Sequence, residues 1–241
     1  MHGRGKHIAA SANGKRNVRT ASLRRARAFA HGNSGGVDDD LPCMSKVLVT
    51  GATGTIGRQV ALALAHDGVP VRAAVRDPAK AADLAKAGVE LVSLDFADPR
   101  SIVAALEGVD RLFLLTPFVE DPKPMIEGVL GAARDAGVRH IVRLSAAGAD
   151  ASSPFALARE HGVIEEAVKR SGSGWTILQP SFFMDNLVNY GGAQTIAAEG
   201  RFYGAAGEGK SAYISGADVG AVAAKILQDP AAHAGQTYVL T

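Results

Sequence analysis

The feature that most constrains this chain of 241 residues is a glycine-rich turn between an apolar run and a helical pattern. The apolar run covers residues 46–50, and a helix is expected from about Thr55 to His66. Glycines spaced like those at 51, 54 and 57 let the backbone turn tightly, approach a pyrophosphate and pack the helix against the strand. The helix also directs its N-terminal N–H groups and positive dipole end at the same place. We therefore predict that a dinucleotide is bound by Gly51, Thr53, Gly54, Thr55, Ile56 and Gly57.

Beyond residue 44 the sequence alternates between short apolar runs rich in β-branched residues and longer helical patterns. Strands are expected at residues 46–50, 71–75, 89–94, 111–115, 140–144 and 175–178. Alternation of this kind is typical of right-handed βαβ crossovers and a parallel sheet covered on both faces. The predicted fold class is therefore α/β, with a Rossmann-like, doubly wound parallel sheet in residues 44–241 and a small C-terminal substrate lobe in segments of about 182–215.

The first 43 residues differ in charge from the rest of the chain. They contain eight Lys and Arg against three Asp, a net charge of +5, so the remainder carries −3 of the overall +2. Few large apolar residues and no periodic face predict that residues 1–43 form a disordered basic tail. This tail is either translated sequence upstream of a natural start at Met44 or an organelle transit segment. The mildly acidic remainder argues against nucleic-acid contact by the folded body.

Composition excludes several further classes of protein. Cys43 is the single cysteine, which rules out an internal disulfide and suits a reducing, cytoplasmic location. The seven histidines are scattered, so no metal site is expected. No apolar run reaches the roughly 18–20 residues that span a bilayer, so no membrane contact is expected.

The residue after the second predicted strand bears on the choice of cofactor. A carboxylate about 20 residues beyond the glycines usually holds the ribose 2′-OH of NAD, whereas an arginine there accommodates the 2′-phosphate of NADP. This chain has Arg76 at that place, with Lys80 one helical turn later, while Asp77 is explained as a helix cap. NADP(H) is therefore favoured over NAD(H). The alternative is that Arg76 lies in solvent without a ligand.

The ends of the later strands are expected to line the same cofactor, because ligands of such sheets lie beyond the carboxyl ends of the strands. Asp95 and Phe96 are placed to meet the adenine, although a plain turn explains them almost as well. The wall beneath the ribose and nicotinamide is assigned to Leu115, Thr116 and Pro117. After the fifth strand, Ser145 provides a hydroxyl beside two alanines that leave room for a ring and an acceptor.

In combination these residues resemble the NmrA-like, atypical branch of the short-chain dehydrogenases/reductases, and bacterial NADPH-dependent quinone and azo reductases within it. The resemblance covers roughly residues 45–241. It rests on the ordered segments 50–57, 75–78, 108–110, 136–142 and 175–186. The family implies a Rossmann-like fold, NADP(H) or, less favoured, NAD(H), and reduction of a small molecule. The family also continues for some tens of residues beyond the last strand, so the substrate lobe is expected to be curtailed.

The chain lacks the tyrosine that serves as the general acid in orthodox members of the family. Orthodox members use Tyr-x-x-x-Lys on the helix after the fifth strand, but residues 154–166 contain no tyrosine. His161 stands at about the place of the lysine and shares a helical stripe with Leu157, Ile164 and Val168, so it is expected to face the sheet. It is read either as a satisfied core histidine or as a contact to the nicotinamide ribose and a proton source of near-neutral pKa.

Hydride transfer to a quinone does not require the missing tyrosine, because the product is a stabilised oxyanion. Alignment of cofactor and quinone in a dry slot supplies most of the acceleration. The predicted function is that of an NADPH-dependent oxidoreductase acting on a quinone or similar conjugated acceptor, with Ser145 and His161 as candidate catalytic residues. The alternative is a redox sensor that binds NADP(H) without turnover. A sugar-nucleotide epimerase or dehydratase is less compatible, since those also use the missing tyrosine. The small-molecule acceptor is the expected partner of a monomer or homodimer, in a slot assigned to Phe118, Phe182, Phe183 and Tyr190.

Overall fold

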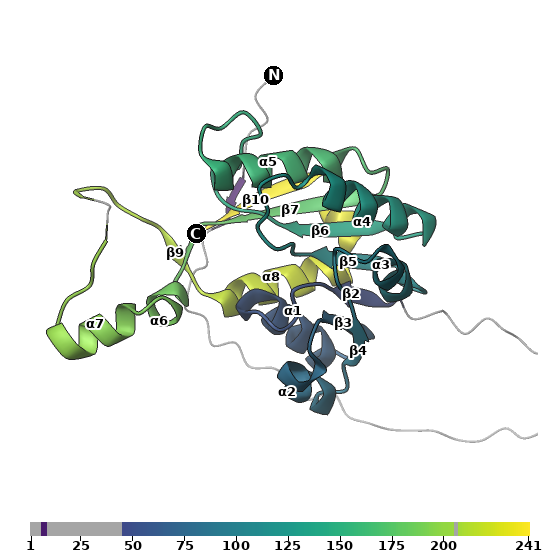
Figure 1. Cartoon of the computed structure of the whole chain (residues 1–241), viewed down its shortest axis with the longest axis horizontal. Coiled ribbons are helices and arrows are strands. Elements are labelled where there is room, and N and C mark those ends of the chain that lie inside the picture. The colour runs from purple at the N-terminus through teal and green to yellow at the C-terminus, as the bar shows by residue number, and fades with distance from the viewer. Residues whose placement is uncertain (1–5, 9–44, 205–206) are drawn as a thin grey trace, which may run out of the picture. The chain divides into compact units, whose positions relative to one another are not determined.

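The computed structural model describes residues 6–8, 45–204 and 207–241. Its main element is an eight-stranded sheet in which every neighbouring pair is parallel (Figure 1). The strands lie in the order β1-β10-β7-β6-β5-β2-β3-β4. They span Lys6–Ile8 (β1), Val47–Val49 (β2), Val71–Val75 (β3), Glu90–Ser93 (β4), Arg111–Leu114 (β5), His140–Leu144 (β6), Gly174–Pro180 (β7) and Gln236–Leu240 (β10).

Helices cover both faces of this sheet, and a second, two-stranded parallel sheet follows β7. The α-helices are Thr55–His66 (α1), Ala82–Lys86 (α2), Pro99–Leu106 (α3), Lys123–Asp135 (α4), Ala156–Lys169 (α5), Asn186–Asn189 (α6), Gly192–Glu199 (α7) and Gly216–Gln228 (α8). The short strands are Phe182–Phe183 (β8) and Tyr213–Ile214 (β9), and two 3-10 turns cover Pro78–Ala81 (η1) and Pro230–His233 (η2).

Each face of the sheet has its own hydrophobic core, because alternate residues of a strand point to opposite sides. Val47 and Val49 of β2 pack with α1 and α8 on one face. Leu48, between them, packs with α3, α4 and α5 on the other face. All three residues are fully buried, as strands covered on both sides require. Figure 1 shows α1 and α8 side by side on one face and α3, α4 and α5 on the opposite face.

Close packing of α8 against α1 fixes the position of the helix that follows the glycine-rich turn. A Cβ at Gly220 would lie 2.6 Å from the Cβ of Gln59, which leaves no room for a side chain between the two helices. At the start of α8, the Ser215 side chain accepts a hydrogen bond from the backbone N–H of Asp218 and caps the helix. Contact with α8 thus holds α1, the helix that follows the glycine-rich turn, in place.

The α/β, doubly wound fold predicted from the sequence is confirmed. The helix from Thr55 to His66 and the strands at 71–75 and 140–144 have the predicted bounds. The remaining strands differ by a few residues at their ends, where fraying makes limits hard to predict. Lys6–Ile8, inside the segment expected to be disordered, forms β1 beside β10. The rest of that segment, with Met44, lies outside the described residues. The segment assigned to the substrate lobe contains β8, α6, α7 and β9.

The described residues contain neither a membrane-spanning helix nor a cluster of metal-binding side chains. None of their helices has both the length and the hydropathy that crossing a membrane requires. Nor do three or more His, Cys, Asp or Glu side chains gather anywhere among them in a group suited to a metal ion.

Candidate functional site

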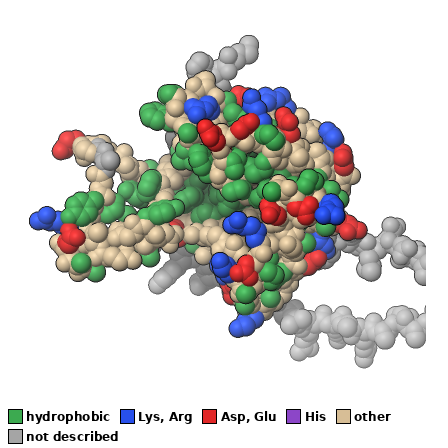
Figure 2. Space-filling model, in the orientation of Figure 1, with side chains coloured by type: hydrophobic (Ala, Val, Ile, Leu, Met, Phe, Trp, Pro, Cys, Tyr) green, Lys and Arg blue, Asp and Glu red, His purple; other side chains and the backbone are tan. Residues whose placement is uncertain are grey.

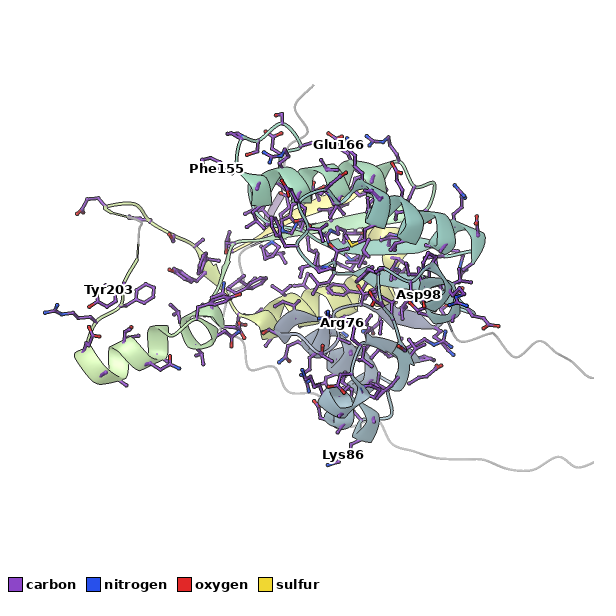
Figure 3. All side chains as sticks on the ribbon, in the orientation of Figure 1. Arg76, Lys86, Asp98, Phe155, Glu166 and Tyr203 are labelled. Atoms are coloured by element: carbon purple, nitrogen blue, oxygen red, sulfur yellow. The ribbon has the colours of Figure 1, made fainter. Side chains whose placement is uncertain are left out.

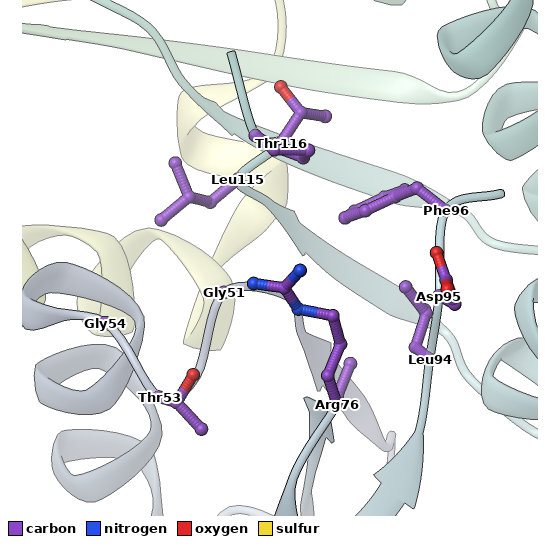
Figure 4. A pocket seen from close by; sticks show the side chains of 11 residues that line it. Gly51, Thr53, Gly54, Arg76, Leu94, Asp95, Phe96, Leu115 and Thr116 are labelled. Atoms are coloured by element: carbon purple, nitrogen blue, oxygen red, sulfur yellow. The ribbon is translucent and has the colours of Figure 1, made fainter. Parts of the chain in front are cut away.

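The sheet changes direction of winding at β2, which creates a crevice at its carboxyl edge. The chain runs from β2 outward through β3 and β4, then returns to the other side of β2 and runs outward again from β5. Ligands of open α/β sheets bind at this switch point. A cavity of about 350 Å³ opens there (Figure 4), lined by Gly51, Thr53, Gly54, Ala74, Arg76, Leu94, Asp95, Phe96, Leu115, Thr116 and Pro117. Nine of these residues are predicted cofactor contacts, and Ala74 and Leu94 are additions that the sequence analysis did not identify.

The glycine-rich turn has the geometry of a phosphate cradle. Gly51 has a φ of 65°, which a residue with a Cβ adopts only with strain. A Cβ at Gly57 would lie 2.3 Å from the carbonyl oxygen of Gly51, so helix and turn touch only because residue 57 is glycine. Gly54 is the N-cap of α1 and provides no side-chain cap. The first N–H groups of α1 therefore have no capping side chain and remain available to an anionic ligand.

Thr50, just before the turn, ties the turn to the opposite wall of the cavity. Its hydroxyl donates to the carbonyl oxygen of Leu115 at 2.8 Å and accepts from the backbone N–H of the same residue at 2.8 Å. Thr50 itself is 1% exposed. These bonds lock the end of β2 to the end of β5, and so hold Leu115 and Thr116 over the turn. Thr50 belongs to the predicted turn motif, but its hydrogen bonds to Leu115 were not predicted.

The two cations predicted for a 2′-phosphate occupy different places. Arg76 follows β3, is exposed, and lines the cavity with its guanidinium pointing inward (Figure 4). Lys80 is not among the residues that line it. The backbone carbonyl of Lys80 instead accepts a hydrogen bond from Arg58 at 2.7 Å, and Arg58 also pairs with Asp83. Arg58 thus anchors η1 beside Arg76. Asp77 caps η1 by accepting from the N–H of Ala79, as predicted.

Two polar side chains of the first cavity, Asp95 and Thr116, differ in how far other protein groups already occupy their hydrogen-bonding atoms. One carboxylate oxygen of Asp95 accepts from the N–H of Ala97 at 2.9 Å, so this side chain closes its own turn. This bond agrees with the plain-turn alternative, although Asp95 and Phe96 both line the cavity. The hydroxyl oxygen of Thr116 is buried and has no hydrogen-bond partner among the described residues. A buried hydroxyl without a partner is costly, so Thr116 fits a bound polar ligand.

A second cavity, of about 440 Å³, adjoins the first. The two cavities share Leu115 and Thr116. Figure 2 shows this region as a hollow lined by hydrophobic side chains, between the segment that carries α6 and α7 and the main sheet. It is lined by Leu115, Thr116, Phe118, Leu144, Ser145, Ala146, Ala147, Leu157, Glu160, His161, Pro180, Ser181, Phe182, Phe183 and Asn186. Five of the six residues predicted for catalysis or for the acceptor slot therefore meet here: Phe118, Ser145, His161, Phe182 and Phe183.

Tyr190 does not join them. It lines a separate hollow with Phe202 and Tyr203, and 82% of its surface is exposed. The hydroxyl of Tyr203 donates to a carboxylate oxygen of Glu199 at 2.6 Å, which places Tyr203 against α7 (Figure 3). Tyr190 directly follows the short helix α6. Phe182 and Asn186 line both this hollow and the second cavity, so Tyr190 lies next to the predicted slot without lining it, and its contact with the acceptor stays a prediction.

A buried polar network lies beneath the second cavity. Arg143 of β6 is 1% exposed and donates to the carbonyl oxygen of Leu114 at 3.2 Å. The hydroxyl of Ser145 donates to Glu165, and the amide of Gln179 donates to the same carboxylate oxygen at 2.8 Å. Ser145 is thereby held in one orientation, with its oxygen available to accept a hydrogen bond from a ligand.

His161 faces Arg143, and this contact settles the protonation of its ring. Its Nδ1 lies 3.4 Å from a guanidinium nitrogen of Arg143. Because a guanidinium only donates, Nδ1 must accept, and the neutral ring carries its proton on Nε2. Burial, with the charge of Arg143, lowers the pKa of His161 to about 4. The near-neutral pKa expected from the sequence is therefore wrong, although a ribose contact through Nε2 stays a prediction.

The helical stripe predicted for His161 holds only in its second half. Ile164 and Val168 are fully buried, whereas 55% of the surface of Leu157 is exposed. Leu157, in the first turn of α5, lines the second cavity instead of the core. Periodicity cannot reveal where the sheet beneath a helix ends.

Glu160 is a residue of this site that the sequence analysis missed. It lines the second cavity and is only 4% exposed. Burial raises the pKa of its carboxyl, while Arg143 and the backbone N–H of Val119 act in the opposite direction. Burial also lowers the pKa of Arg143 to about 10, against the opposing charges of Glu160 and Glu165. A signal was present: Arg143 interrupts an apolar strand that is buried on both faces, and such a cation requires acidic partners.

Comparison with known proteins places this geometry in a family. Residues 51–230 match the family described as NAD(P)H-binding. The chain is 43% identical over 195 residues to the NAD(P)H azoreductase of Xenophilus azovorans, covering 81% of this chain and 67% of that protein. It is 36% identical over 198 residues to Quinone oxidoreductase 2 of Escherichia coli strain K12, covering 80% and 68%.

Solved structures agree with these relatives. The crystal structure of the NADPH-dependent quinone oxidoreductase of Escherichia coli complexed with NADPH matches with a TM-score of 0.69 at 36% identity, over 80% of this chain and 68% of that one. The Citrobacter sp. triphenylmethane reductase complexed with NADP(H) matches with a TM-score of 0.70 at 32% identity, again over 80% and 68%. The chain belongs to the NAD(P)H-binding family, and its resemblance to the NmrA-like, atypical short-chain dehydrogenases/reductases is confirmed.

Proposed function

We propose that this chain is an NADPH-dependent reductase that transfers hydride to a quinone or a similar flat, conjugated acceptor. The observation that carries the proposal is the pair of adjoining cavities that share Leu115 and Thr116. One cavity contains the phosphate cradle and the other is lined mainly by apolar and aromatic side chains. Two ligands seated in them would meet at the shared wall, which is the arrangement that transfer between a cofactor and an acceptor requires.

The residues of the first cavity fit NADPH. The N–H groups at the start of α1 suit the pyrophosphate, and the guanidinium of Arg76 suits the 2′-phosphate. The partnerless hydroxyl of Thr116 would meet a polar group of the ribose or nicotinamide. When bound, the reduced cofactor supplies the hydride.

The second cavity suits a planar acceptor. Phe118, Phe182 and Phe183 offer aromatic surface, and Ser145 is held by Glu165 as a fixed polar contact. The helix α5 has no tyrosine, so the acid of the orthodox enzymes is missing. Conjugated acceptors tolerate that loss because their reduced forms stabilise negative charge. The names of the two curated relatives, an azoreductase and a quinone oxidoreductase, support the same class of acceptor.

The test is oxidation of NADPH, followed by absorbance, with a simple naphthoquinone and the full chain. The proposal predicts consumption that saturates with quinone and is much slower with NADH. NADPH binding without acceptor-dependent consumption, across a panel of quinones and azo dyes, would contradict it.

A second function, a redox sensor without turnover, is favoured by one observation: α5 lacks the Tyr-x-x-x-Lys pair. A sensor requires different affinities for NADPH and NADP⁺ and a protein partner whose binding follows that difference. Calorimetric titration with each cofactor form separates the two functions, since a reductase needs no large difference.

A further inference from the structure

The second cavity offers little to balance the charge that arrives with a hydride. An acceptor that gains a hydride becomes an anion until it gains a proton. Among the described residues around this cavity, none is a lysine or an arginine, and most are apolar. Negative charge is costly in such surroundings. A proton donor inside the cavity would remove that cost.

Among the described residues that line the second cavity, only His161 and Glu160 have ionisable side chains. His161 is excluded as an imidazolium donor, because protonation of Nδ1 would set two donors against each other at the contact with Arg143. Glu160 has no such constraint. Its carboxyl can carry a proton, and α5 holds it at the cavity wall with 4% of its surface exposed.

Arg143 is the cation that acts on the carboxyl of Glu160. It is fully buried beneath the cavity, and its charge favours the ionised form of Glu160. The carboxylate left after a proton has departed would therefore be stabilised by a cation that is not itself among the lining residues. The backbone N–H of Val119, in the loop after β5, also favours the ionised form of Glu160, while His161 and Glu165 of the same helix act on Arg143.

We propose that Glu160 is the proton donor to the acceptor in the second cavity. With a quinone, one carbonyl oxygen takes up the hydride and becomes a hydroxyl, which leaves the negative charge on the other oxygen. The O–H bond of Glu160 then breaks, and its proton forms an O–H bond on that second oxygen. The acceptor gains two electrons from the cofactor and leaves as a neutral hydroquinone, and the carboxylate regains a proton from water. This inference rests on the proposed function and adds a catalytic residue to it. The raised pKa of Glu160 agrees with it, because the protonated form then persists at higher pH.

The test compares Glu160→Gln with Glu166→Gln, an exposed residue of the same helix. Glutamine keeps the shape of Glu160 and an oxygen that accepts from Val119, but it has no carboxyl proton to give. We expect kcat with a naphthoquinone to fall by about 100-fold or more in Glu160→Gln. The proposal also predicts that kcat decreases toward high pH in the wild type and in Glu166→Gln, and that this decrease disappears in Glu160→Gln.

A second readout uses the protein without cofactor. In an infrared titration, the band of a protonated carboxyl should persist in the wild type and Glu166→Gln at a pH where ordinary carboxyls have ionised, and it should be missing in Glu160→Gln. Equal kcat and pH profiles in the two variants, or identical infrared titrations, would overturn the role of Glu160 while leaving the reductase intact. A wild type that consumes no NADPH with any acceptor removes the proposed function itself, and the role of Glu160 with it.

Discussion

Gly57→Ala is the sharpest test of the phosphate cradle. The added Cβ would lie 2.3 Å from the carbonyl oxygen and 2.6 Å from the carbonyl carbon of Gly51. Both atoms are backbone, and Thr50 ties the neighbouring strand end to Leu115, so the turn cannot yield by rotating a side chain. An ordinary contact therefore requires α1 to move from the turn by about 1 Å.

This displacement has two measurable consequences. Overpacking of this kind costs about 1–3 kcal/mol, and we expect the upper end because the overlap involves backbone on one side. The N–H groups of α1 would also be displaced from the phosphates, and losing one charge-assisted hydrogen bond at about 1.5–3 kcal/mol weakens NADPH binding by roughly 10-fold to 150-fold.

The assays are urea unfolding and fluorescence titration with NADPH. The matched control is Gly128→Ala in α4, where an added Cβ meets no atom within 4 Å. Alanine is the better helix former, so this variant should be as stable as the wild type or up to about 1 kcal/mol more stable, with unchanged binding. Wild-type stability and affinity in Gly57→Ala would refute the argument that helix and turn meet at this glycine.

Two further predictions concern cofactor choice and pH. Arg76→Ala should weaken NADPH binding much more than NADH binding, because only NADPH has the 2′-phosphate; equal losses, or the same effect from Lys86→Ala on the exposed side of α2 (Figure 3), would count against the assignment. Burial lowers the pKa of His140 from its ordinary 6.5 to about 4, so the unfolded chain binds the proton more readily. The resulting stability, about 3 kcal/mol, is fully present above pH 6.5 and is lost as the pH falls toward 4. Urea unfolding across this range should show a smaller loss in His140→Gln than in the wild type, whereas His66→Gln, with a side chain 89% exposed, should lose as much as the wild type.

Much of the cofactor site was predictable because its determinants are local. The helix Thr55–His66 and the strand His140–Leu144 have the predicted bounds, since their periodicity is complete within a few residues. The glycine turn and Arg76 also follow from position along the chain, because the carboxyl ends of parallel strands meet at one edge.

The second cavity required the tertiary structure. Nothing in the local sequence distinguishes Glu160 from a surface residue, yet it is 4% exposed. Tyr190, by contrast, is 82% exposed. Burial of a side chain depends on where a helix ends relative to the sheet, and no local pattern contains that distance. The exposed Leu157 in the stripe of His161 is a further instance.

The sequence by itself therefore determined the βαβ alternation, the cradle and the place of the cation beside it, because each depends on neighbours along the chain. Only the tertiary structure decided which charges meet. Arg143 from one strand, with Glu160 and Glu165 from the following helix, forms a cluster whose electrostatics depend on burial and on distances of a few ångströms. Burial in this cluster lowers the pKa of His161 and raises that of Glu160, and no local sequence pattern contains the burial of either side chain.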